Sequence, residues 1–270
     1  MPSIDPEFSV VEEFGNVEKY QQRPQRSLHY FFLVDTSGSM GGEKIAQLNA
    51  AMDTLLPILK DAIKSGNVEN NFNIVGDIRV IRFATGADWY IGDAANPVPL
   101  DGFVWTPLTV GGVTHTASAI EHLLEGLSRE YMGNQNIPPV CILISDGECT
   151  EALEKYNAVI EKMNKSGWGK RAIRAAIAIG NDYNEVELAK FAGPAGAVFQ
   201  VTEINRIGDL IKFVSQQVTR SATSSRSTNI STPSNKYHDS IVPASNIGDG
   251  VVVKDASVIL KNAGFPDFIE

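Results

Sequence analysis

The 270-residue sequence is poor in cysteine, has no excess of basic residues and contains no long apolar run. Its two cysteines, Cys141 and Cys149, fit neither a zinc site nor a disulfide framework in number or spacing. No apolar stretch approaches the roughly 20 residues that a membrane span requires. The formal net charge is -9, and an acidic surface repels phosphate backbones. We therefore expect neither a nucleic-acid partner nor a membrane partner.

The N-terminal stretch also lacks the pattern of a signal peptide. The segment MPSIDPEFSVVEEFGNVEKY carries acidic residues where a signal peptide has a basic start followed by an apolar core. Cys141 lies within the apolar run PPVCILISDG, where a small buried thiol is its expected role. Together these features predict a cytoplasmic protein.

From Leu28 to about Val218, apolar strand-like runs alternate with helical patterns. The runs LHYFFLVD and CILISDG are apolar at almost every position, which is typical of parallel strands covered on both faces. The run GDIRVIRFAT alternates more and predicts a strand nearer an edge, paired with ADWYIG, with Arg79 and Arg82 pointing one way. The runs RAIRAAIAIGND and AVFQVT complete the predicted strands of this region.

Helical patterns lie between these runs. The segment GEKIAQLNAAMDTLLPILKDAIKSG places apolar residues at three- and four-residue spacing, and Pro57 within it is expected to divide the helix. Further helices are predicted over residues 116–127, 151–163, 185–191 and 204–218. Strands and helices in alternation indicate parallel strands with right-handed crossovers. We therefore predict a doubly wound α/β fold, with a mostly parallel sheet and helices on both faces.

The composition divides the chain into four parts. Residues 1–27 form an N-terminal extension and residues 28–220 the α/β domain. Residues 221–236 are rich in serine and threonine. We predict a flexible linker there, because the segment has few apolar side chains to bury. Residues 237–270 contain a strand candidate, GVVV, and a helix candidate, DASVILKNAG, but are too short to fold alone. We expect this last part to be a docking segment, on its own domain or on another chain.

Polar side chains follow two of the predicted strands at the points where they end. Asp35 ends the first strand, with Ser37 and Ser39 in the next loop, and Asp146 ends another. Thr114 lies in a glycine-containing loop just ahead of a helix. The carboxyl ends of parallel strands meet at one edge of a doubly wound sheet, where ligands bind. Two carboxylates and three hydroxyls make an all-oxygen set that suits Mg²⁺ and leaves a coordination position for an incoming carboxylate.

Several neighbours of these residues are candidates for a partner-binding rim. Thr116 competes with Thr114 for the threonine position of the metal site, and the distance to the following helix favours Thr114. His115 is either a ligand contact or a solvated loop histidine. Trp105 either forms a wall of the binding face or packs under a helix. Glu148, directly after the Asp146–Gly147 turn, is a further rim candidate.

The segments VDTSGSM, GGVTHTASAI and LISDGE, in this order, resemble the motifs of a von Willebrand factor A (VWA) domain. The metal-ion-dependent adhesion site (MIDAS) of that family has the pattern Asp-x-Ser-x-Ser, then Thr, then Asp. Its ligands correspond here to Asp35, Ser37, Ser39, Thr114 and Asp146. The resemblance implies a protein-binding module that uses Mg²⁺, with Mn²⁺ or Ca²⁺ as alternatives, to capture an acidic residue of a partner protein.

A narrower resemblance is to the bacterial tellurite-resistance VWA group, the TerY-like proteins. The segments FVWTPLTVGGVT and LISDGECTEAL are similar to that group. The sequence departs from it at Val113, inserted between the glycine pair and Thr114, and at Cys149, where proline is common. The cysteine-rich C-terminal zinc module of some members has no counterpart here. The resemblance implies a cytoplasmic scaffold in a stress-response system, with a protein kinase or a metal-dependent phosphatase among its partners.

Two other functions compete with a binding module. An Mg²⁺-dependent phosphoryl-transfer or hydrolytic enzyme is disfavoured because DTSGSM offers only hydroxyls beside its aspartate. No P-loop or glycine-rich nucleotide motif occurs either. A subunit of a larger ATPase-coupled or antiviral complex differs from the first hypothesis mainly in the identity of the partner. We predict a protein that is not an enzyme.

Overall fold

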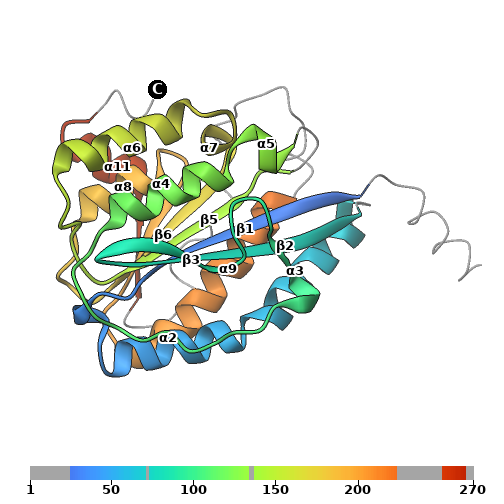
Figure 1. Ribbon diagram of the computed structural model, residues 1–270, viewed down its shortest axis with the longest axis horizontal. Coiled ribbons are helices and arrows are strands. Elements are labelled where there is room, and N and C mark those ends of the chain that lie inside the picture. Colours follow the sequence, from blue (N-terminus) through green and yellow to red (C-terminus); the bar gives the residue numbers. More distant parts are fainter. Residues whose placement is uncertain (1–24, 71–72, 134–136, 224–250, 266–270) are drawn as a thin grey trace, which may run out of the picture.

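The computed structural model describes residues 25–70, 73–133, 137–223 and 251–265, and within them one eight-stranded sheet is flanked by two layers of helices (Figure 1). The strand order is β3-β2-β1-β5-β6-β7-β8, and β4 pairs with β2. The strands are β1 (Arg26–Asp35), β2 (Ile74–Ala84), β3 (Gly86–Ile91), β4 (Val98–Pro99), β5 (Val140–Ser145), β6 (Ile173–Ile179), β7 (Ala197–Val201) and β8 (Val251–Asp255).

The five central strands are parallel, whereas β3 and β8 close the two edges in antiparallel pairs. The predicted doubly wound, mostly parallel α/β fold is therefore confirmed. The predicted pairing of GDIRVIRFAT with ADWYIG is also found, as β2 with β3. Strand β4 has no counterpart among the predicted strands, because two residues carry no periodic signal.

The helices form one layer on each face of the sheet (Figure 1). The first layer contains α2 (Glu43–Asp53), α3 (Leu55–Asn70) and α9 (Ile207–Thr223). The second contains α4 (Thr116–Gly126), α6 (Leu153–Lys165), α8 (Glu185–Ala192) and α11 (Ala256–Asn262), with the short α5 (Arg129–Met132) and α7 (Gly167–Arg171). Three short 3-10 turns are η1 (Gly38–Met40), η2 (Leu100–Gly102) and η3 (Ile204–Arg206).

The predicted division of the first long helix is confirmed. Thr54 separates α2 from α3, and Pro57 lies in the first turn of α3. The amide that proline lacks has no partner within a helix at that position, so proline is tolerated there.

The central strand β1 shows why the strand runs are continuously apolar. Tyr30, Phe32 and Val34 pack toward α2, α3 and α9, in one core cluster. Phe31 and Leu33 face the opposite way and pack toward α4 and α6, in the second cluster. All five side chains are fully buried. Successive side chains of a strand point to opposite faces, so a sheet covered on both sides has no polar face.

The described part of the predicted docking segment packs on this domain. Strand β8 pairs with β7 from Val201↔Val251 to Ala197↔Asp255, and α11 packs against α8. Asp255 caps the N-terminus of α11, because its carboxylate accepts from the Ser257 amide at 2.8 Å. Residues 1–24, 224–250 and 266–270 lie outside the described residues, so the predicted segment boundaries stay predictions.

The expectation that Arg79 and Arg82 point the same way is wrong. Residues three apart in a strand fall on opposite faces. Arg79 is 1% exposed and donates to the carbonyl oxygens of Asp93, at 2.8 Å, and Ala94, at 3.1 Å. Arg82 is exposed and lies 3.7 Å from the carboxylate of Asp88. The buried guanidinium of Arg79 also donates to Nδ1 of His29 at 3.1 Å.

The contact between Arg79 and His29 generates a prediction for the pH dependence of stability. Burial and the Arg79 charge lower the pKa of His29 from 6.5 to about 3. The unfolded chain therefore takes up a proton below about pH 6.5 that the folded chain refuses, so stability falls as the pH falls. Between pH 7 and pH 5 this residue is expected to remove about 2 kcal/mol of unfolding free energy.

The measurement is urea denaturation of the wild type and His29→Gln at both pH values. The variant should lose this part of the pH dependence, and His122→Gln, which leaves the Arg79 contact intact, should keep it. An identical pH dependence in the wild type and His29→Gln would contradict the prediction.

Candidate metal site

The predicted site lies where the order of the strands reverses. The connection from β1 to β2 passes through α2 and α3 on one face of the sheet, whereas α6, which follows β5, lies on the other. Strands β1 and β5 are parallel neighbours, so Asp35 and Asp146 lie at the same edge of the sheet, where folds of this kind bind ligands.

Asp35 is fully buried and its carboxylate is held on both oxygens. Oδ1 accepts from the backbone amide of Ser37 at 2.8 Å, and Oδ2 accepts from the hydroxyl of Ser145 at 2.5 Å. Burial raises the pKa of Asp35, the hydrogen bonds from Ser145 and Ser37 lower it, and the Asp146 charge raises it. Burial is the largest of these effects, so the net pKa is raised.

The two serines connect this carboxylate to the second one. The hydroxyls of Ser37 and Ser39 are 3.0 Å apart, and Ser39 Oγ donates to Asp146 Oδ1 at 2.7 Å. The other oxygen of Asp146 lies 2.5 Å from the Lys44 ammonium. Ser37 and Asp146 are each 2% exposed, whereas Ser39 is exposed, so the site reaches the surface at Ser39.

Thr114 joins the group from the loop before α4. A β-carbon built on Gly147 would lie 3.6 Å from Thr114 Oγ1 and 3.9 Å from Ser39 Oγ, so both hydroxyls border the same space. The Thr114 backbone is fixed by Thr150, whose amide donates to the Thr114 carbonyl at 2.8 Å. The structure thus brings together the five predicted residues, and their role as metal ligands stays a proposal.

The glycine pair before Thr114 allows its loop to close on the Asp35 loop. Gly112 has a φ of +84°, and a β-carbon on it would lie 2.5 Å from Thr85 Oγ1. The Gly38 amide donates to the Gly112 carbonyl at 3.1 Å, and the Gly111 amide donates to the Thr36 carbonyl at 2.8 Å. A side chain at Gly112 would therefore press on Thr85, which follows β2, and shift the Thr114 loop.

The four rim candidates have different positions. Trp105 is 7% exposed and donates from Nε1 to Asn49 Oδ1 at 3.1 Å, so of its two predicted roles the structure shows packing in the core. Thr116 begins α4 and is 4% exposed, which also removes it from the rim. His115 is half-buried, and its Nδ1 accepts from the Gly86 amide at 2.9 Å. Glu148 is exposed.

Sequence reasoning missed Ser145 and Lys44. The pairing Val34↔Ile144 places Ser145 beside Asp35, so a correct strand register would have identified it. Lys44 had no such signal, because its position depends on the direction in which α2 leaves the loop.

The donor set suits a hard cation and depends on hydroxyls. No cluster of three or more His, Cys, Asp or Glu side chains that could hold a metal occurs among the described residues. Two carboxylates and three hydroxyls nevertheless supply only oxygen, which Mg²⁺ and Ca²⁺ prefer.

Burial raises the pKa of the Cys149 thiol, so this neighbour is not an activated nucleophile.

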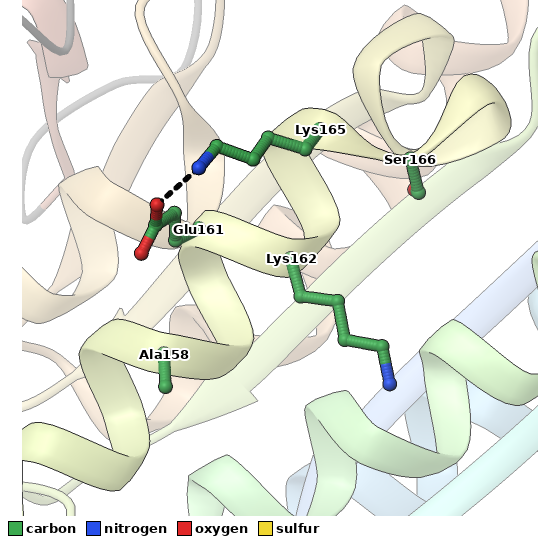
Figure 2. A pocket seen from close by; sticks show the side chains of 5 residues that line it. All are labelled: Ala158, Glu161, Lys162, Lys165 and Ser166. Carbon is green, nitrogen blue, oxygen red and sulfur yellow. Dashed lines mark hydrogen bonds and ion pairs between the residues drawn. The ribbon is translucent and has the colours of Figure 1, made fainter.

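A surface depression of about 470 Å³ lies elsewhere, on the outer side of α6 (Figure 2). It is lined by Ala158, Glu161, Lys162, Lys165 and Ser166. Glu161 pairs with Lys165 along the helix, and Lys162 points away from that pair. Helix α6 leads away from the Asp146 loop, and these residues occupy its later turns, so the depression is not part of the candidate site.

The hydrogen bond from Ser145 generates a second prediction. Ser145→Ala leaves Oδ2 of a fully buried carboxylate without its donor, which is expected to lower the unfolding free energy by about 1–3 kcal/mol. Ser39→Ala, at an exposed hydroxyl, should have less than half that effect, since Lys44 still contacts Asp146. Thermal and urea denaturation without added metal measure both, and equal effects of the two variants would contradict the prediction.

Comparisons with known proteins agree with the observed topology. Residues 103–213 match the family model of the von Willebrand factor type A domain. The human collagen alpha-6(VI) chain is 25% identical over 201 residues, which are 72% of this chain and 8% of that one.

None of the helices in the described part of the chain combines the length and apolarity needed to cross a bilayer.

Solved structures share the fold at low sequence identity. A von Willebrand factor type A protein from Catenulispora acidiphila is 14% identical, with a TM-score of 0.54 over 72% of this chain and 43% of that one. Proximal thread matrix protein 1 from the mussel byssus is 18% identical, with a TM-score of 0.52 over 73% of this chain and 49% of that one. This chain thus spans less than half the length of either structure. Residues 103–213 are thus similar to a von Willebrand factor type A domain, and the solved structures share the fold.

Proposed function

We propose that this chain is a protein-binding module that depends on a divalent cation. Asp35, Ser37, Ser39, Thr114 and Asp146 would hold the ion. The observation that carries the proposal is the convergence of these side chains from three separate loops, within hydrogen-bonding distance or around the space beside Gly147. VWA domains are commonly protein-interaction modules, which supports the same function.

The proposed ion is Mg²⁺, with Mn²⁺ or Ca²⁺ as alternatives. Another structure of the mussel protein, 15% identical with a TM-score of 0.50, has a zinc-occupied MIDAS motif. Zinc in proteins is usually held by histidine and cysteine. The all-oxygen set proposed here favours the harder ions.

The proposed ligand from the partner is a carboxylate. The two aspartates balance the charge of a divalent ion, and the three hydroxyls are neutral. Mg²⁺ prefers six ligands, so a position remains for one oxygen from outside. An acidic side chain of a partner protein can supply that oxygen, because carboxylates are common ligands of Mg²⁺.

An enzymatic alternative has less support. The sequence argument against phosphoryl transfer was that DTSGSM offers only hydroxyls beside its aspartate. The ammonium of Lys44 contacts Asp146, so that argument no longer holds. Asp35 is still unsuited to be a nucleophile or a base. It is fully buried, and both of its oxygens accept hydrogen bonds.

The rim beside the site suggests what surrounds the partner's acidic residue. Val110 and Val113, in the loop before Thr114, are 36% and 44% exposed. Val110 lies next to the Asp35 loop, since a β-carbon on Gly41 would be 3.7 Å from its Cγ2. We therefore propose a partner segment in which apolar side chains flank the acidic residue.

The finer assignment is a cytoplasmic scaffold of a tellurite-resistance or stress-response system. It is supported by the TerY-like segments and by two free cysteines, one buried and one partly buried. A kinase or metal-dependent phosphatase of that system is the proposed partner. Membership of a larger ATPase-coupled or antiviral complex is the alternative, in which the same site would bind another subunit.

A third prediction tests the metal site. Mg²⁺ or Mn²⁺ should raise the melting temperature, and EDTA should reverse the rise. At 100 times the dissociation constant the gain is about 2.7 kcal/mol, or several degrees for a domain of this size. Thr114→Val should weaken metal binding, whereas Thr116→Val should not.

Calorimetric titration and thermal denaturation provide the measurements. Asp35→Asn, which keeps the shape of the side chain, should show no metal-dependent shift while its circular dichroism stays native. A wild type that responds to no divalent ion would contradict the proposed function.

A fourth prediction separates the rim from the metal site. Val113→Ser should reduce metal-dependent capture of a partner from native lysate by several-fold, because it removes exposed apolar area from the contact. Its metal affinity should equal that of the wild type. Leu153→Ser, at an exposed leucine on α6, serves as a matched control. Equal capture by the wild type and Val113→Ser would rule out a role for this residue in partner binding.

A further inference from the structure

Lys44 contacts two of the three loops of the candidate site, those of Ser39 and Asp146. It lies in the first turn of α2, and its ammonium is 2.5 Å from Asp146 Oδ2 and 3.3 Å from the Ser39 carbonyl oxygen. The Asp146 side chain is fully buried, whereas that of Lys44 is 25% exposed. The dipole of a helix disfavours a cation in its first turn. The attraction that holds the ammonium here therefore comes from the site and not from the helix.

We propose that Lys44 competes with the divalent cation for the Asp146 carboxylate and thereby sets the affinity of the site. This inference rests on the proposed function. A divalent ion already balances Asp35 and Asp146, so an ammonium that stays beside Asp146 adds an uncompensated positive charge. Repulsion between charges a few ångströms apart is strong where water is excluded. Binding of the ion therefore drives the ammonium away from Asp146.

The side chain of Lys44 is suited to this movement. Its four-carbon stem is flexible, and it is already partly exposed, so the ammonium reaches water without a change in the backbone. An ion binds to the site only if its attraction to the two aspartates exceeds the attraction of the Lys44 ammonium to Asp146. Lys44 thus selects for divalent over monovalent ions and keeps the affinity moderate.

The test is a calorimetric titration with Mn²⁺ at fixed ionic strength. Lys44→Gln should bind at least tenfold more tightly than the wild type, and Lys44→Arg should stay within about threefold. Lys60→Gln is the matched control, because it removes the same charge from an exposed pair with Asp101. Its dissociation constant should not change by more than twofold.

A second measurement uses the wild type alone and is independent of any variant's folding. Acetylation of individual lysines, followed by mass spectrometry, should show Lys44 several-fold more reactive with saturating Mn²⁺ than with EDTA, and Lys60 unchanged. Equal Mn²⁺ affinity of the wild type and Lys44→Gln, or unchanged Lys44 reactivity, would overturn the competition and leave the metal site intact. Absence of binding by both proteins would overturn the proposed function together with this inference.

Discussion

The feature on which the site depends is the burial of two carboxylates beside one another. Asp35 and Asp146 are at most 2% exposed, and the charge of Asp146 contributes to the raised pKa of Asp35. The surrounding groups all stabilise the charged carboxylates. Ser145 and the Ser37 amide donate to the first carboxylate, and Ser39 and Lys44 donate to the second. Four donors around two buried carboxylates show how much stabilisation the pair requires, and the proposed divalent cation would supply more of it.

The fold creates this arrangement by making β1 and β5 neighbours. Both strands carry polar residues at the point where they leave the sheet, Asp35 in β1 and Ser145, followed by Asp146, in β5. Parallel pairing brings those points to the same edge, and the reversal of strand order keeps helices from covering it. The third loop is then fixed by backbone contacts, from Gly38 to Gly112 and from Thr150 to Thr114. Main-chain hydrogen bonds therefore fix the positions of the loops that carry the side chains of the site.

Most of the fold and of the candidate site follows from local patterns. The apolar runs identify the long strands, and Pro57 identifies the break between α2 and α3. The spacing of Asp35, Ser37 and Ser39 identifies the loop at the centre of the site. Contacts made across the sheet are harder to predict, because they depend on register and on helix direction.

Three residues illustrate that limit. The sequence pattern was interpreted as placing Arg79 on the same side as Arg82, although the period of two in a strand excludes it. The sequence around Trp105 allows a position on the rim or in the core. Its hydrogen bond to Asn49 shows that it lies in the core. Lys44 carries no signal at all, because a lysine in the first turn of a helix usually faces water.

A metal-anchored contact between proteins does not require a deep cavity. The described surface does contain a hollow, on α6, but its lining is an exposed helical ion pair and neighbouring side chains (Figure 2). A small-molecule site needs concavity because it must surround its ligand. A carboxylate that completes the shell of a fixed ion gains strength from one short ionic bond, and the rest of the partner can lie on a nearly flat rim. The exposed valines beside Thr114 and the exposed residue Ser39 would form the rim of the proposed contact.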